Sequence, residues 1–461
     1  MNYLTKKLDA FFNISESGSN IKREVLGGIS GYLAMAYIIF VNPSVLADAG
    51  MNPDAVFAAT VIGAAIATLI MGLYAKFPLG LAPCMSMNAF FAYSVVKGTG
   101  FSWEEALACV FVSSVLFIIL SISGMRFKIL QAIPDVLKNA GSVGLGLFIA
   151  FIGFKNSGII VADESSMIKF GSLTNPNTIM AMVGILVLAI LLVRKSKSAV
   201  ILSMLSSLVI GLIIVGLNSN GIINLSEEVA STLPALKGDL IVLPKVPLES
   251  MFNDTFLVAL KSVPKVLSIS GISVVLTFTF LDFFGTAATL SAATTQVKNF
   301  DIDTKGNKRL YFVDAISSLI GSLLGTSNIT TYIESVSGIV AGARTGLMAV
   351  VMAVLFLLSL FLYPLLSLFT SAVTAPALIA IGIFMFQNVS TINWNSSFET
   401  SIPAFLTIVL MPLTGSIALG LTFGFIFYTL LMLIAKRRKE IHNYMYVIAF
   451  ISIIYIISEV F

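Results

Sequence analysis

The chain has 461 residues, of which 57% are hydrophobic and only 11% are charged, and its mean hydropathy is +0.99. Soluble domains carry roughly a quarter charged residues, so this composition excludes a soluble protein and indicates a polytopic α-helical membrane protein. The net charge of +4 comes from short Lys and Arg clusters between apolar runs, which argues against a nucleic-acid partner.

The polar N-terminus, residues 1–23, lacks the short apolar core and the cleavage site of a signal peptide. We therefore expect it to stay in the cytoplasm and the first apolar run to remain as a membrane anchor. The two cysteines, Cys84 and Cys109, both lie in apolar context, so we expect no disulfide framework.

Apolar runs long enough to cross a bilayer follow one another along the chain. In the first half they cover residues 24–46, 55–76, 80–97, 104–123, 142–163, 176–194 and 198–217. A polar loop, 218–255, and an expected interfacial stretch, 256–265, come next. The second half continues with 267–296, 310–325, 328–343, 345–366 and 369–387.

The apolar run 401–435 would be roughly 50 Å long as one helix, which exceeds the roughly 30 Å core of a bilayer. Pro412 and Gly415 stand where a turn would divide it. Two spans also place the basic cluster 436–439 in the cytoplasm, as the positive-inside rule prefers. We therefore predict fourteen spans, and the last apolar stretch, 444–457, is either a further span or an interfacial tail.

Two short interrupted hydrophobic segments, 79–91 and 325–335, occupy matching places in the two halves. Each breaks a membrane helix with Gly, Pro, Ser or Thr and restarts a helix near a polar residue, Asn88 or Glu334. Each follows the start of its half by a similar distance, about 57 and about 60 residues, which favours two inverted repeats of seven spans. Free backbone groups cannot face lipid, so such breaks indicate a substrate site inside the protein.

Acidic residues are scarce within the spans, and Asp282 and Glu334 are the main candidates for function. A neutral carboxylic acid donates a hydrogen bond whereas its ionised form only accepts, so one residue can carry a proton and recognise a polar, planar ligand. The alternative is a structural carboxylate that a helix N-terminus or neighbouring Ser and Thr satisfy. We expect a structural role for Asp314, near a cationic cluster, and we expect Arg344 to anchor a membrane face.

Asn88 can either cap its helix or present two donors and an acceptor to a ligand. Phe280 could stack on a flat ligand, although packing is the commoner role in a chain with 35 Phe. The sequence shows no nucleotide-binding loop, metal-ligand cluster or nucleophile motif, so we expect no cofactor, no metal and no enzyme activity. Uphill transport would then use an ion gradient, and the two carboxylates favour protons.

Several motifs in order resemble the AzgA-like hypoxanthine/guanine/adenine permeases of the nucleobase–ascorbate transporter superfamily. They are MAYIIFVNPS at 35–44, GLAP at 80–83, NAFFAY at 88–93, GLFIAFIG at 146–153, TTYIES at 330–335, RTGL at 344–347 and IPAFLTI at 402–408. The likeness covers nearly the whole chain, and the motifs are specific together although each is weak alone.

The resemblance implies an all-α fold of fourteen transmembrane segments in a 7+7 inverted repeat, with short extended stretches in spans 3 and 10. A core domain (spans 1–4, 24–125, and spans 8–11, 267–366) would move against a gate domain (spans 5–7, 126–218, and spans 12–14, 367–435). Residues 219–266 would form an extracytoplasmic loop with the interfacial segment, and 436–461 the basic cluster and C-terminal hydrophobic segment. The family also suggests a homodimer through the gate domain.

The resemblance further implies proton symport of purine bases. The substrate-binding residues that it implies are Asn88, Asp282 and Glu334, with Met85, Met87, Phe280, Tyr332 and Ile333 around the cleft. Glu334 and Asp282 would couple transport to protons.

Three places depart from the family pattern. The purine permeases usually carry a second Asp at the position of Gly285. A glycine at this position is more similar to the uracil and xanthine branches. Cys84 and Ser86 replace two glycines of the first break, and Leu419 replaces an Asp near the last turn. These changes bear on which ring is transported.

We therefore expect a proton-coupled importer of purine nucleobases in the cytoplasmic (inner) membrane, whose partners are the small-molecule base, the proton and the lipid bilayer. A transporter of xanthine or uracil, or a passive facilitator of the same fold, is the alternative. An anion transporter of the sulfate/bicarbonate type should present cationic or backbone sites rather than two carboxylates, and an intramembrane enzyme would need a nucleophile or metal set.

Overall fold

The computed structural model describes residues 3–123, 132–196, 198–236, 243–294, 297, 305–395 and 397–460. Most of them are helical, and two small antiparallel sheets add two strands each. Within these residues, nine helices are long and apolar enough to cross a membrane. The expected all-α polytopic class is therefore confirmed.

The first crossing is built from two helices, because the chain leaves the helical ladder between Met35 and Ile38. The elements up to the fourth apolar run are α1 (Tyr3–Phe12), α2 (Ile21–Met35), α3 (Ile38–Ala47), α4 (Pro53–Ile70) with a π-helical turn (Met71–Ala75), β1 (Leu81–Pro83), α5 (Met85–Ala89) with a π-helical stretch (Phe90–Val96), α6 (Lys97–Thr99) and α7 (Trp103–Ile122). Local sequence sets these boundaries: Asn52 and Pro53 begin α4, and Ser102 and Glu105 form a capping box on α7.

The fifth crossing lies seven residues earlier than predicted, and the expected range 142–163 is wrong at both ends. Helix α9 runs over Asp135–Asn156, begins after Pro134, and exposes a first turn in which Lys138 and Asp135 form an ion pair of 2.7 Å. The chain turns at Gly158 (φ +73°), and β2 (Ile160–Asp163) then pairs with β3 (Met167–Phe170) in a hairpin. Hydropathy missed the polar first turns of α9 and read an apolar strand as helix.

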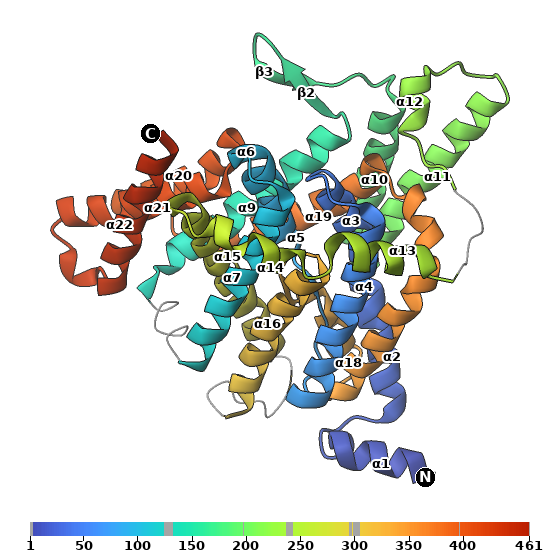
Figure 1. The fold of residues 1–461 in the computed structure, drawn as a ribbon, viewed down its shortest axis with the longest axis horizontal. Helices are drawn as coiled ribbons and strands as arrows, with labels where there is room; N and C mark the ends of the chain where they lie inside the picture. Colours follow the sequence, from blue (N-terminus) through green and yellow to red (C-terminus); the bar gives the residue numbers. More distant parts are fainter. Residues whose placement is uncertain are drawn as a thin grey trace.

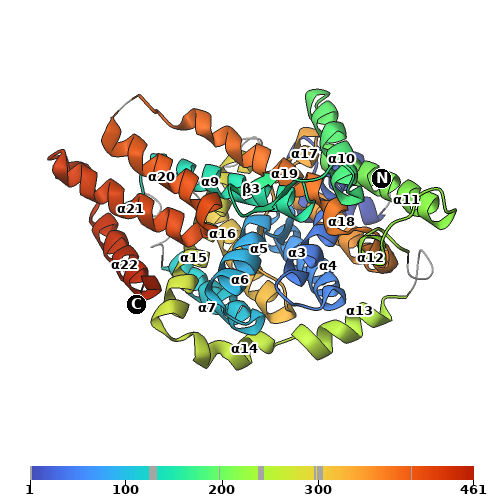
Figure 2. The same ribbon diagram turned by 90° about the horizontal axis from the view of Figure 1, so that it is seen from above.

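The rest of the first half is helical. It contains α10 (Pro176–Val193), α11 (Ala199–Ser219) and α12 (Glu227–Ser231). The end of the predicted polar loop forms α13 (Lys245–Ser250) and a π-helical turn (Met251–Thr255), and the predicted interfacial stretch 256–265 forms α14 (Val258–Ser262) and a 3₁₀ turn (Val263–Val266). Figure 2 shows α13 and α14 running along one side of the molecule, outside α4, α16 and α7.

The second half repeats the pattern of long helices around one break. Its elements are α15 (Ile269–Thr294), α16 (Lys305–Leu324), β4 (Ile329–Thr331), a 3₁₀ turn (Ile333–Ser335), α17 (Val336–Val340), α18 (Gly346–Leu358) with a 3₁₀ stretch (Ser359–Leu368), α19 (Ser371–Phe386) with a 3₁₀ turn (Gln387–Thr391), α20 (Phe398–Thr414), α21 (Ile417–Ile434), a 3₁₀ turn (Arg438–Glu440) and α22 (Asn443–Val460). The predicted turn after Pro412 is confirmed, because α20 ends at Gly415 in the left-handed conformation (φ +68°). The apolar stretch 444–457 is helical and packs on α21 and α15.

The helices pack in two groups that are each drawn from both halves of the chain (Figure 1). The α4 group comprises α2, α3, α4, α7, α15, α16 and α18, and the α9 group comprises α9, α10, α11, α19, α20 and α21. Glycine allows the closest approach within the α4 group: a Cβ at Gly346 would lie 2.1 Å from the carbonyl oxygen of Gly72. The two breaks, β1–α5 and β4–α17, meet in the interior of the molecule.

Candidate functional site

The two broken helices meet through a short antiparallel ladder of β1 and β4. Leu81 pairs with Thr331 and Pro83 with Ile329. The ladder continues on both sides, because the Tyr332 N–H donates to Gly80 (3.0 Å) and the Cys84 N–H donates to the Asn328 carbonyl (2.9 Å). Backbone groups that a helix would otherwise satisfy are thus paired inside the protein, as a membrane interior requires. We call this region the crossover.

Asn88 lies on α5 and is fully buried at the crossover. Its Oδ1 accepts a hydrogen bond from the hydroxyl of Ser327, and its Nδ2 contacts Met85 Sδ at 3.4 Å. Met85 and Met87 are buried beside it. Asn88 therefore joins the first break to the second through its side chain.

Asp282 is buried on α15 and faces the second break. Ser318 on α16 donates to its Oδ2 at 3.0 Å, and the Asn328 amide donates to the same oxygen at 3.4 Å. Three residues further along α15, an added Cβ at Gly285 would meet no atom within 4 Å. There is thus open space where the purine permeases usually carry a second Asp.

Asp314, for which we expected a structural role near a cationic cluster, is fully buried at the crossover. Its carboxylate accepts hydrogen bonds from the hydroxyls of Thr286 and Thr330, both at 2.7 Å, and from the Thr331 N–H at 3.3 Å. The Thr286 hydroxyl also lies 3.5 Å from Asp282 Oδ1. Because a hydroxyl has one proton, it donates to the nearer Asp314 and links the two carboxylates through one side chain.

Glu334 lies in the 3₁₀ turn after β4 and takes its hydrogen bond from a different element. The Tyr37 hydroxyl, between α2 and α3, donates to Glu334 Oε1 at 3.0 Å. Tyr332 is buried and donates through its hydroxyl to the Pro83 carbonyl at 2.6 Å, while Ile333 is 44% exposed. Asp282 on α15 is thus bound to Asn328 just before β4, and Glu334 just after β4 is bound to Tyr37.

Phe280 packs toward α21 and α22. Its ring packs against Phe425 of α21 with a centroid distance of 6.2 Å, and it lines a cavity of about 40 Å³ between α15, α21 and α22. The residues that give the crossover an accessible edge are instead Cys84, Ser86, Ile333 and Glu334, which are all at least partly exposed.

Three buried acceptor atoms of the crossover have no hydrogen-bond partner within the described part of the chain. They are Asn42 Oδ1, Asn328 Oδ1 and Thr331 Oγ1. Buried polar atoms are nearly always paired, so such a group indicates a place where a ligand or water donates. Sequence reasoning missed Asn42. Its side-chain amide donates hydrogen bonds to the hydroxyls of Thr60 (2.6 Å) and Thr326 (2.8 Å).

Two further buried or half-buried carboxylates were missed because they stand at the ends of the predicted spans. Glu24 is fully buried and accepts from the N–H groups of Arg344 (2.7 Å) and Thr345 (3.2 Å), so that it caps α18. Asp48 accepts from the Tyr93 hydroxyl (2.6 Å) and the Asn156 amide (3.0 Å). The Arg344 side chain, expected to anchor a membrane face, donates to the Ala343 carbonyl at 2.7 Å at the end of α17.

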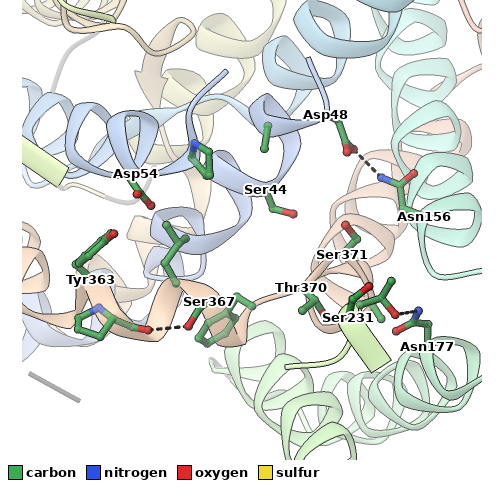
Figure 3. Close-up of a pocket in the computed structure, with 17 residues that line it drawn as sticks. Ser44, Asp48, Asp54, Asn156, Asn177, Ser231, Tyr363, Ser367, Thr370 and Ser371 are labelled. Carbon is green, nitrogen blue, oxygen red and sulfur yellow. Dashed lines mark hydrogen bonds between the residues drawn. The ribbon is translucent and has the colours of Figure 1, made fainter. Parts of the chain in front are cut away.

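A wide cavity lies apart from the crossover. It has a volume of about 620 Å³ and opens between the α3–α4 turn, the end of α9, the start of α10 and the start of α19 (Figure 3). Asp48, Asp54 and Asn156 point into it from its walls. The cavity therefore adjoins both helix groups, whereas the carboxylates of the crossover lie in the α4 group.

Comparison with known proteins places the chain in a family. A profile of the permease family, Xan_ur_permease, matches residues 22–454. The chain is 40% identical to the guanine/hypoxanthine permease PbuG of Bacillus subtilis, over 98% of this chain and 99% of that protein. It is 34% identical to the adenine permease AdeP of Escherichia coli, over 98% of this chain and 96% of that protein.

Solved structures agree on the fold. The transmembrane domain of a cyanobacterial bicarbonate transporter, BicA, matches with a TM-score of 0.59 at 14% identity, over 86% of this chain and 96% of that chain. Murine Slc26a9 matches with a TM-score of 0.55 at 12% identity, over 90% of this chain and 69% of that chain. The chain belongs to the permease family, as its likeness to the AzgA-like permeases predicted, and it is a multi-pass membrane transporter rather than an enzyme.

Proposed function

We propose that the chain is a proton-coupled secondary transporter that imports a purine nucleobase, hypoxanthine, guanine or adenine, across the cytoplasmic membrane. Relatives that match it over their full length are named for these bases. A site built from carboxylates and amides also suits a neutral heterocycle, because carboxylates and amide oxygens accept from its N–H groups and amide N–H groups donate to its ring nitrogens.

The observation that carries the proposal is the set of unpaired acceptors at the crossover. Asn42 Oδ1, Asn328 Oδ1 and Thr331 Oγ1 are buried and receive no hydrogen bond from any residue that the structure describes, and Glu334 stands at the accessible edge nearby. A purine ring carries N–H donors on its edge and would therefore satisfy these acceptors. In a purely structural site each acceptor would stay unpaired, which costs about 1–3 kcal/mol of folding free energy. The ring would enter along Cys84, Ser86 and Ile333.

Proton coupling follows from the chemistry of the two carboxylates. A protonated Glu334 donates a hydrogen bond to a ring nitrogen or carbonyl, whereas the ionised group accepts from a ring N–H or from Tyr37. If one protonation state binds the base more tightly, proton and base shift the same conformational equilibrium together. Asp282 would carry the second proton-sensitive position, through Asn328.

The proposal includes fourteen crossings in two inverted repeats of seven, with a core domain that moves against a gate domain. Its support is the grouping of helices: the α4 group holds both breaks, and the α9 group combines three helices from each half. The crossover would then move with the α4 group past α19 and α9. A homodimer through the gate domain stays a prediction.

Uptake into proteoliposomes tests the proposal. With an inward proton gradient, the purified protein should accumulate radiolabelled hypoxanthine or adenine, and a protonophore should abolish the accumulation. A panel of unlabelled adenine, guanine, hypoxanthine, xanthine and uracil should then rank the purines first. Equilibration without accumulation would indicate a passive facilitator, and stronger competition by xanthine or uracil would move the substrate to those branches.

A further inference from the structure

The cavity of about 620 Å³ is walled by elements of both helix groups. Ser44 and Asp54 belong to the α3–α4 end of the α4 group, and Asn156 and Asn177 belong to α9 and α10 of the α9 group (Figure 3). It lies on the face that carries the end of α3, opposite the N-terminal helix α1 (Figure 1). With the N-terminus in the cytoplasm, this is the outer face.

A stacked pair of aromatic rings stands at the wall of this cavity. Phe369, which precedes α19, lines the cavity and stacks on Phe40 of α3 with centroids 3.8 Å apart and planes 5° from parallel. Both side chains are buried. One turn before Phe40 on the same crossing stands Tyr37, whose hydroxyl holds Glu334. The order from the cavity to the proposed substrate carboxylate is therefore Phe369, Phe40, Tyr37 and Glu334.

Phe40 lies on α3 of the α4 group, whereas Phe369 lies in the short connection between the 3₁₀ stretch after α18 and α19, where the chain passes from the α4 group to the α9 group. A relative motion of the groups that carries this connection along with α19 would separate or slide the stack. A polar contact at the cavity rim also joins the groups: the Asn156 amide donates to Asp48 at 3.0 Å and lies 2.9 Å from the Tyr93 hydroxyl. The stack is thus placed where motion between the groups would open or close a passage.

We propose that the cavity is an outer entry site for a neutral planar base and that the Phe40–Phe369 stack is the gate between this entry site and Glu334. The inference rests on the proposed nucleobase transport. A planar ring can replace one phenylalanine as the stacking partner of the other, because offset and parallel aromatic contacts are favourable for heterocycles as well. The base itself would then help to part the rings.

The charge of the cavity selects the same class of ligand. Asp48 and Asp54 contribute two carboxylates, and the described residues that line it include no Lys, Arg or His. A cavity lined by one sign of charge raises the local concentration of oppositely charged species and repels species of the same sign, while neutral species are not repelled. The entry site therefore favours a neutral or cationic base over an anion.

Chemical labelling of Cys84 tests the gate without requiring transport. Cys84 is partly exposed at the crossover and is not among the residues that line the cavity, and the second thiol, Cys109, is buried and can be replaced by Ala. In a Cys109→Ala background, a membrane-impermeant maleimide would be applied to intact cells, so that it reaches Cys84 from the cavity face. Phe369→Ala and Phe40→Leu should each raise the labelling rate roughly two- to tenfold, the range that corresponds to losing one aromatic pair.

A matched control is Ser371→Ala, which changes the same cavity wall outside the ring stack and should leave the rate unchanged. The two gate variants lie on different elements, and size-exclusion chromatography shows whether each is folded. If one variant misfolds, the labelling rate of the other decides. Unchanged labelling in a folded gate variant would overturn the gate. Added adenine or hypoxanthine should slow the labelling of Cys84, which would support the proposed function separately. If the bases give no protection while the gate variants still raise the labelling rate, the result contradicts the proposed substrate but not the gate.

Discussion

The Tyr37 hydroxyl donates a hydrogen bond of 3.0 Å to the Glu334 carboxylate, and thereby joins the kink of the first crossing to the turn of the second broken helix. Tyr37 stands between α2 and α3 and is itself buried. The carboxylate that we propose to bind base and proton is therefore positioned by a residue nearly three hundred positions earlier in the chain, as the sequence separation of 297 shows.

Replacing Tyr37 by Phe keeps the ring and removes the donor. Since a hydrogen bond to a charged group contributes about 1.5–3 kcal/mol, the loss should lower kcat/KM for uptake by roughly tenfold or more. Initial rates in proteoliposomes measure it. Tyr32→Phe is the matched control. Tyr32 lies on the same crossing as Tyr37, but its hydroxyl pairs with Ser359 at 2.6 Å, so this variant should leave transport unchanged. Equal effects of the two variants would remove the special role of Tyr37.

The two aspartates of the crossover should separate by phenotype. Asp314→Asn replaces an acceptor of two hydroxyls and one N–H by an amide, so we expect a loss of stability of about 1–3 kcal/mol, seen as a lower unfolding midpoint. Asp282→Asn should instead abolish proton-driven accumulation while the protein still binds the base. A folded Asp282→Asn variant that accumulates base normally would show that Asp282 has no part in coupling.

Glu24 should matter for stability rather than transport. Its carboxylate is fully buried and satisfies the N–H groups of Arg344 and Thr345 at the start of α18. Glu24→Ala leaves both donors buried and unpaired, which costs about 1–3 kcal/mol. Glu24→Gln keeps one acceptor and should lose less. Thermal unfolding in detergent compares the two with Glu164→Ala, an exposed control; a Glu24→Ala midpoint equal to that control would refute the cap.

A surface ion pair gives a pH dependence whose sign is fixed. Arg437 donates to Glu440 at 2.6 and 2.7 Å and to Glu399 at 3.0 Å, and its guanidinium lowers the pKa of Glu440 below the ordinary 4.5. A lowered pKa stabilises the fold above the ordinary value, and this contribution is lost as the pH falls through the folded-state value. Arg437→Ala should therefore lower the unfolding temperature at pH 7, and the difference should shrink below pH 4.5. A difference that grows in acid would contradict this assignment.

Hydropathy and helix-breaking residues were enough to predict the all-α polytopic class and the two breaks. The predicted segments 79–91 and 325–335 do contain β1 and β4, because Gly, Pro, Ser and Thr cannot continue a membrane helix there without leaving backbone groups free. The fifth crossing was misplaced since α9 begins with the polar turns after Pro134, which hydropathy assigns to a loop.

The contacts of the site could not be predicted in the same way. The register that pairs Leu81 with Thr331 depends on tertiary packing, and nothing local marks Tyr37, in an apolar run, as the partner of Glu334. Glu24 and Asp48 stand at span ends, where a charged residue is expected to face water. Only the fold reveals that Glu24 caps another helix and that Asp48 lines a cavity between the helix groups.

Accumulation of radiolabelled hypoxanthine by Glu334→Gln proteoliposomes under an inward proton gradient tests the central claim most directly. Glutamine keeps the size and one acceptor but cannot exchange a proton, so we expect accumulation above equilibrium to disappear. Phe90→Leu, a buried packing change whose ring contacts Phe278, should retain it. Gradient-dependent accumulation by Glu334→Gln at the wild-type level would contradict the account.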